Sequence, residues 1–120
     1  MIPLMNLTRQ YQNLEHKLDQ AALQVLHSGK YILGEEVAEF EREFAVYCGV
    51  KYAVGVGNGT DALVIALLAA GVGQGDEVIT CAMSFFATAE AIAAVGAVPV
   101  FVDCTRDTYV IDAHMIEQKV

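Results

Sequence analysis

The sequence is poor in positive charge. Seven Lys and Arg residues stand against fifteen Asp and Glu residues in a chain of 120, which gives a formal net charge of -8. A negative protein repels a nucleic-acid backbone, and no cluster of basic residues offsets this repulsion. DNA and RNA are therefore poor candidates as partners. A small anion is not excluded, because the N-terminus of one helix can outweigh a diffuse and screened net charge.

Long apolar runs are also missing. Although 55% of the residues are hydrophobic, no run approaches the roughly 20 apolar residues that span a bilayer. Only 18% of the residues are charged, which is typical of a folded globular protein rather than a disordered tail. The stretch from Met1 to Leu7 lacks the basic start and apolar core of a signal peptide, so we expect a cytoplasmic location.

Cysteine and histidine are few and show no paired spacing. The cysteines at 48, 81 and 104 are odd in number and widely separated, so we expect buried free thiols rather than disulfides or zinc ligands. The histidines are equally scattered, which argues against a metal site or a general base at His16, His27 or His114.

The first fifty residues carry two helical patterns. Apolar residues recur at helical spacing from Leu14 to Leu26, and Ser28-Gly29 ends that pattern. A second amphipathic pattern runs from about Glu35 to Tyr47 and closes at Cys48-Gly49. Two helices are expected here.

From Tyr52 onward, strand and helix patterns alternate. Strands are expected over 52–56, 77–80 and 98–102, with helices over 60–70 and 86–95. The strands are apolar throughout, which favours a mostly parallel sheet flanked by helices and hence an α/β fold. No repeat or linker divides the chain, and its length is short for a complete cofactor-dependent enzyme. We expect a single incomplete unit, with helices over about 1–50 and the α/β part over about 51–120.

A glycine-rich turn, Gly55–Asp61, joins the first expected strand to the next helix. Its glycines let the backbone approach a ligand, and the first helical turn offers unpaired N–H groups to an anion. Thr60 adds a hydroxyl donor. The carboxylate of Asp61 would repel a phosphate dianion, so its backbone N–H is the expected contact. The alternative is a plain tight turn in which Asn58 or Thr60 only caps the helix.

Two nucleotide-binding signatures fit this turn poorly. The Walker A motif would need a Gly-Lys-Ser/Thr ending, which is absent. The dinucleotide fingerprint would place a third glycine where the permitted variant Ala62 stands, and an acidic residue at the end of the next strand, where Cys81 and Ala82 follow. A small nucleotide-binding domain is therefore a weaker alternative.

Two more positions are expected at the carboxyl edge of the sheet. Phe85 follows the second expected strand, where its ring can lie against a flat heteroaromatic ligand. At least one of the adjacent Phe85 and Phe86 is expected in the core. Asp103 ends the last strand, where its carboxylate could meet a ligand or cap the turn through Thr105.

Five segments stand in a characteristic order and spacing: Ser28–Gly34, Gly57–Leu63, Gly75–Thr80, Phe85–Ala89 and Gly96–Asp103. Together they resemble the N-terminal third of the DegT/DnrJ/EryC1/StrS aminotransferases. The resemblance implies the N-terminal part of the large domain of the fold type I transferases that use pyridoxal 5'-phosphate (PLP). It further implies a homodimer with shared active sites, a nucleotide-linked keto-sugar as substrate and an amino acid as amino donor.

The resemblance also implies roles for individual residues. Gly59, Thr60 and the backbone of Asp61 fall on the phosphate-binding turn, and Asn58 stands where the family often has Ser but can still donate a hydrogen bond. Phe85 falls on the aromatic residue that stacks on the pyridine ring. Tyr31 lies in a segment near the active site and is a candidate substrate contact.

The family's Schiff-base lysine and its pyridine-pairing aspartate fall beyond residue 120. Lys17, Lys30, Lys51 and Lys119 match neither the motif nor its location. Without that lysine the normal covalent chemistry cannot proceed, so these residues alone are not expected to be active. A non-catalytic module that holds PLP or another phosphate is the alternative. We also expect an unpaired strand edge and uncovered apolar faces.

Overall fold

The computed structural model describes residues 3–120, and contacts group them into two compact units. One unit extends up to Gly55 and the other runs from Val56 to Val120. The boundary lies close to residue 51, where the sequence predicts the α/β part to begin. Within residues 3–120, no helix has the length and apolar character needed to cross a membrane.

The first unit contains α1 (Leu7–Ser28) and α2 (Glu35–Cys48). Helix α1 begins earlier than the predicted Leu14, because Asn6 caps it by accepting a hydrogen bond from the N–H of Arg9 at 3.0 Å. Both helices end at a glycine in the left-handed conformation, with φ of 68° at Gly29 and 66° at Gly49. The predicted ends of both helices are thus confirmed to within a few residues.

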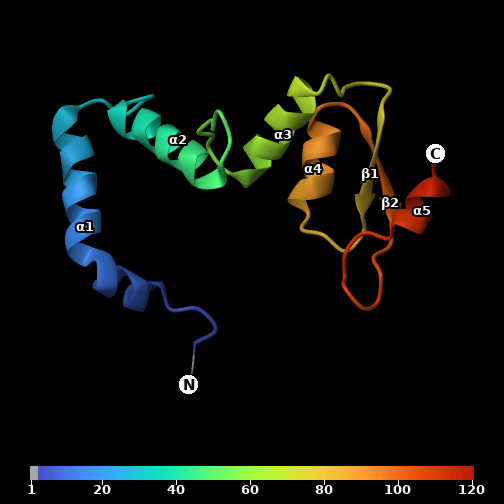
Figure 1. Ribbon diagram of the computed structural model, residues 1–120, viewed down its shortest axis with the longest axis horizontal. Coiled ribbons are helices and arrows are strands. Elements are labelled where there is room, and N and C mark those ends of the chain that lie inside the picture. The colour runs from blue at the N-terminus through green and yellow to red at the C-terminus, as the bar shows by residue number, and fades with distance from the viewer. Residues whose placement is uncertain (1–2) are drawn as a thin grey trace. The chain divides into compact units, whose positions relative to one another are not determined.

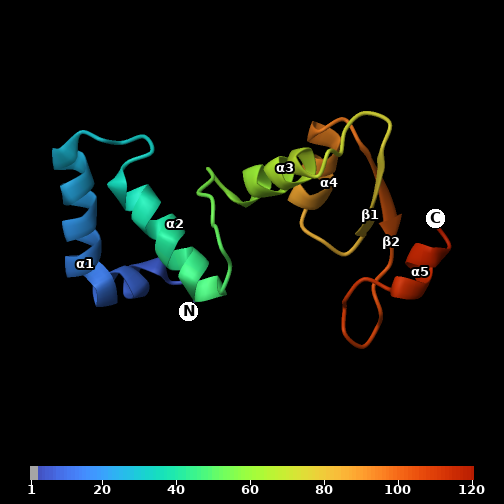
Figure 2. The same cartoon turned by 45° about the horizontal axis from the view of Figure 1, so that its top comes forward.

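The second unit contains a two-stranded parallel sheet and three helices (Figures 1 and 2). The elements follow in the order α3 (Gly59–Ala69), β1 (Glu77–Cys81), α4 (Ala87–Ala94), β2 (Val98–Val102) and α5 (Ala113–Glu117). Helix α4 connects the two strands and contacts both of them, while α3 packs along α4. This strand–helix–strand arrangement confirms the predicted α/β class. Helix α5 was not predicted.

Small side chains form much of the core of this unit. Ala87 and Ala91, four residues apart on one face of α4, are buried, as is Ala97 just before β2. Ile92 and Val102 are the larger core residues, with exposed fractions of 3% and 2%. Because alanine adds little bulk, α4 can lie close to the elements it covers.

The strand predicted over 52–56 is wrong: the backbone there is irregular. A strand needs a neighbouring strand to receive its backbone hydrogen bonds, and residues 52–56 pair with no strand in the part of the chain that the structure describes. The N–H of Gly55 instead donates to the Glu41 carboxylate of α2 at 2.6 Å. A Cβ at Gly55 would lie 3.3 Å from both Glu41 Oε1 and Val37 Cγ1, so glycine allows this close approach.

Candidate functional site

The glycine-rich turn is held by a reciprocal pair of hydrogen bonds. Asn58 is the N-cap of α3, with an extended backbone, and its Oδ1 accepts from the N–H of Asp61 at 2.9 Å. In return, Asn58 Nδ2 donates to Asp61 Oδ2 at 3.0 Å. The pair resembles a capping box, in which the N-cap residue and the third helical residue satisfy each other. The N–H of Asp61, expected to contact a phosphate, therefore has an acceptor within the turn.

Two backbone donors lie between Asn58 and Asp61. The N–H groups of Gly59 and Thr60 open the first turn of α3, where no acceptor lies within the helix. A Cβ built on Gly59 meets no atom within 4 Å, so the approach to the helix end is open. Thr60 is half-buried and adds a hydroxyl group. Backbone donors, the positive end of the helix dipole and a hydroxyl are a donor set that suits a phosphate group.

Phe85 lies in the loop that joins β1 to α4. It borders a hollow of about 270 Å³ together with Phe86, Phe101 and smaller side chains that include Ser84 and Thr88. The hydroxyl oxygens of Ser84 and Thr88 are 2.7 Å apart, which ties the loop to the first turn of α4. An aromatic ring beside a small hollow suits a flat ligand.

The prediction that Phe85 or Phe86 lies in the core is wrong for the described residues, because 82% of Phe85 and 74% of Phe86 is exposed. The loop places both rings ahead of α4, outside the alanine-lined contact that the helix makes with its neighbours.

The glycine-rich turn and Phe85 share one side of the second unit. Figure 1 shows that α3 and α4 run in the direction opposite to β1 and β2, so each helix begins toward the end of the unit where the strands finish. Ligands of parallel α/β sheets commonly bind at this carboxyl edge. That the start of α3 and Phe85 contact one ligand at this edge stays a prediction.

Asp103 follows β2 at the same edge but bonds locally. Its Oδ1 accepts from the N–H of Cys104 at 2.8 Å, whereas the Thr105 hydroxyl pairs with that of Thr108 at 2.5 Å. Asp103 therefore does not cap the turn through Thr105.

The cysteines differ in burial. Partial burial, and next the nearby charge of Asp103, raise the pKa of the Cys104 thiol, whose Sγ contacts Met83 Sδ at 3.5 Å. A raised pKa disfavours the reactive thiolate. The three cysteines are free, but the expectation of burial is wrong for Cys48, which is exposed; Cys81 and Cys104 are half-buried.

Tyr31 belongs to the first unit, while the other five predicted site residues belong to the second. Its hydroxyl donates to the backbone oxygen of Leu26 at 3.0 Å, and 63% of the residue is exposed. The loop from Gly29 to Gly34 lines a hollow of about 330 Å³ around it. A substrate contact by Tyr31 stays a prediction.

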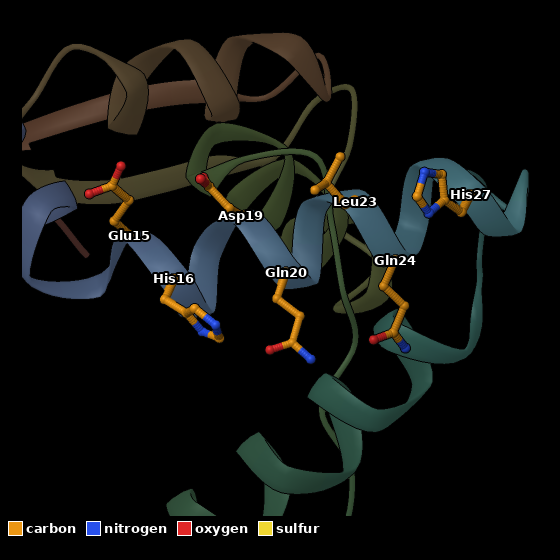
Figure 3. A pocket seen from close by; sticks show the side chains of 7 residues that line it. All are labelled: Glu15, His16, Asp19, Gln20, Leu23, Gln24 and His27. Carbon is orange, nitrogen blue, oxygen red and sulfur yellow. The ribbon is translucent and has the colours of Figure 1, made fainter.

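A larger hollow, of about 710 Å³, runs along α1 and carries none of the predicted site residues. Figure 3 shows its lining as two rows of side chains, Glu15-Asp19-Leu23 and His16-Gln20-Gln24, with His27 near the helix end. Each row follows the four-residue spacing of one helix. No group of three His, Cys, Asp or Glu residues in the part of the chain that the structure describes could hold a metal ion.

Comparison with known families settles the relationship of the chain. The model of the DegT/DnrJ/EryC1/StrS aminotransferase family matches residues 12–120. The chain belongs to this family. The resemblance predicted from the five segments is thus confirmed.

Individual family members are similar over nearly the whole chain. It is 47% identical over 120 residues to the dTDP-3-amino-3,6-dideoxy-alpha-D-galactopyranose transaminase of Aneurinibacillus thermoaerophilus, covering 100% of this chain and 33% of that protein. Among solved structures, DesV of S. venezuelae has a TM-score of 0.96 at 41% identity, covering 99% of this chain and 32% of that one. A Bacillus subtilis structure, ntda with bound cofactor PMP, has a TM-score of 0.93 at 35% identity, covering 99% and 28%.

These matches confirm the predicted fold as the N-terminal part of a fold type I transferase domain. The chain spans about a third of the length of the curated relatives it matches. The predicted alternative that Asn58 caps the helix is confirmed, whereas sequence reasoning missed the return bond from Asn58 to the Asp61 carboxylate and the Glu41–Gly55 bond. The Asn-x-x-Asp spacing resembles the capping-box pattern and is a signal for the first; nothing in the sequence marks the second, which joins residues fourteen apart.

Proposed function

We propose that these residues form the cofactor-holding part of a PLP-dependent aminotransferase that moves an amino group between an amino acid and a nucleotide-linked keto-sugar. The observation that carries the proposal is the open donor set of Gly59 and Thr60 at the start of α3, and the exposed ring of Phe85 supports it. The relationship to a dTDP-sugar transaminase supports the substrate class.

In this proposal, different residues bind different parts of PLP. The N–H groups of Gly59 and Thr60 and the Thr60 hydroxyl would hold the phosphate, and Asn58 and Asp61 would keep the turn in shape. Phe85 would lie against the pyridine ring and fix its plane. When bound, PLP supplies an electron sink for bond breaking beside the transferred nitrogen. Tyr31 would contact the sugar substrate, and the active protein would be a homodimer.

In the proposed enzyme, the catalytic lysine lies outside the second unit. The second unit contains one lysine, Lys119, which follows α5 rather than a strand of the site. This observation favours the alternative, a module that holds PLP or another phosphate without catalysis, for residues 1–120 taken alone.

The test uses the complete protein product that contains residues 1–120. Purified protein is mixed with PLP, L-glutamate and a set of dTDP- and UDP-linked keto-sugars, and aminated sugar is measured by mass spectrometry. Sugar-dependent amination supports the proposal. PLP binding without amination supports the non-catalytic module instead, and the absence of any absorbance change at millimolar PLP contradicts both.

A further inference from the structure

Three observations converge on the side chain of Asp61. Its Oδ2 accepts from Asn58 Nδ2 at 3.0 Å, while its own N–H donates to Asn58 Oδ1 at 2.9 Å. The same Oδ2 lies 2.6 Å from the position that a Cβ on Gly57 would take. The Asp61 side chain therefore folds back toward Gly57, and Asp61 engages both polar atoms of the Asn58 side chain, Nδ2 through its carboxylate and Oδ1 through its backbone N–H.

A carboxylate at this place could act in two opposite ways. It could compete with an incoming phosphate, because both are anions and both favour the positive end of the helix. Alternatively, it could hold the turn in the conformation that presents the remaining donors. The two roles predict opposite effects of removing the carboxylate, so they are separable by measurement.

The contacts favour the second role. Asn58 uses both of its polar side-chain atoms on Asp61, which leaves the N–H groups of Gly59 and Thr60 as donors in the first turn. The space beside Gly59 is open to at least 4 Å, so the folded-back carboxylate does not fill it. We propose that Asp61 is a positioning residue whose carboxylate braces Asn58 and so orients Gly59 and Thr60 toward a phosphate group. The inference rests on the proposed function.

Substitution of Gly57 provides an independent test of the contact between Asp61 and Asn58. Its φ is outside the left-handed region, so its need for glycine comes from space rather than from backbone conformation. A methyl group at 57 would displace the Asp61 carboxylate, because 2.6 Å is too short for a carbon–oxygen contact. Gly57→Ala should therefore reproduce the effect of Asp61→Ala, and combining the two should add little.

The experiment measures binding of pyridoxamine phosphate and of pyridoxamine to the complete protein product by equilibrium dialysis. Pyridoxamine phosphate carries the phosphate but forms no covalent link to lysine, and pyridoxamine lacks the phosphate. The variants are Asp61→Ala, Asp61→Asn, Gly57→Ala and the Gly57→Ala/Asp61→Ala pair. Asp76→Ala is the matched control, because Asp76 Oδ2 makes a comparable turn bond to the N–H of Gly73 at 2.8 Å.

We expect Asp61→Ala to weaken pyridoxamine phosphate binding about tenfold, the size of one lost hydrogen bond, and to leave pyridoxamine binding unchanged. Asp61→Asn keeps an oxygen acceptor for Asn58 and should stay within about threefold of the wild type. Gly57→Ala should match Asp61→Ala, and the double variant should be no weaker than either. Asp76→Ala should leave the ratio of the two affinities unchanged.

Tighter pyridoxamine phosphate binding by Asp61→Ala and Asp61→Asn would show that the carboxylate competes with phosphate, and would overturn the inference. Additive losses in the double variant, or a wild-type affinity in Asp61→Ala, would overturn it as well. If Asp61→Ala does not fold, as judged by circular dichroism, Gly57→Ala decides by the criteria given for Asp61→Ala, and tighter binding by Asp61→Asn would still overturn the inference. A wild-type protein that binds both ligands equally would instead refute the phosphate site itself, and with it the proposed function.

Discussion

Thr60 offers an anion a hydroxyl as well as a backbone N–H, and valine has the same shape without the hydroxyl. Thr60→Val should weaken binding of pyridoxamine phosphate by about 1 to 3 kcal/mol, the usual cost of a lost hydrogen bond to a charged group. Isothermal titration of the complete protein product measures this change. Thr60→Ser keeps the hydroxyl and should stay near the wild type; equal affinities for the Val and Ser variants would refute the role.

The two adjacent phenylalanines provide a second residue-scale prediction. Both rings are exposed, so either is free to contact a ligand, and the family resemblance predicts that Phe85 is the ring that stacks. Phe85→Ala should therefore weaken binding of pyridoxamine, which has the ring but no phosphate, more than Phe86→Ala does. Fluorescence titration with both variants measures the difference. Indistinguishable affinities would mean that the stacking ring is misassigned.

For individual residues, the sequence predicted which ones could donate to a phosphate, but not how their neighbours hydrogen-bond to one another. Gly59 and Thr60 stand out as donors because a glycine-rich turn before a helix has a known backbone geometry. The hydrogen bonds of Asn58 to Asp61 depend on the rotamers of two side chains, which the spacing alone does not fix.

The elements of the chain were predicted best where local signals set them. The strand over Val98–Val102 was predicted at its observed bounds, and glycines mark the ends of α1 and α2. The short helix α5 was missed because its five residues are too few for an apolar period to show in the sequence. Its local signal is one cap, in which Asp112 accepts from the N–H of His114 at 3.0 Å. The strand over 52–56 failed because pairing is a tertiary property that no local pattern contains.

The hydrogen bond from the Gly55 N–H to Glu41 leads to a prediction about stability. Glu41 is half-buried, and its carboxylate accepts the backbone N–H at 2.6 Å. Glu41→Ala should lower the free energy of unfolding by about 1 to 2 kcal/mol, allowing for partial exposure, while Glu41→Gln keeps an acceptor and should lose less. Urea denaturation of the complete protein product measures both. Glu43→Ala, at an exposed position on the same helix, is the control and should change stability by less than about 0.5 kcal/mol.

If Glu41→Ala and Glu43→Ala are equally stable, the Glu41 bond contributes nothing to folding.

Among residues 3–120, exposed large apolar side chains outnumber the buried ones. The buried apolar residues among those described are Ala45, Ala87, Ala91, Ile92, Ala97 and Val102, most of them small. Large apolar side chains are exposed in both units, among them Phe40 and Phe44 in the first and Val98 and Phe101 in the second. The two-stranded sheet also leaves backbone groups at its edges without a strand partner. The uncovered faces predicted from the sequence are thus confirmed for residues 3–120.

Such surface predicts how residues 1–120 behave when produced alone. Exposed apolar patches and open strand edges promote association, so the isolated segment should bind the dye ANS and sediment as aggregates or oligomers. The complete protein product, which carries additional chain if it resembles its relatives in length, should bind much less ANS per mole. Analytical ultracentrifugation and ANS fluorescence at equal concentrations compare the two. A monomeric segment with no ANS signal would contradict this prediction.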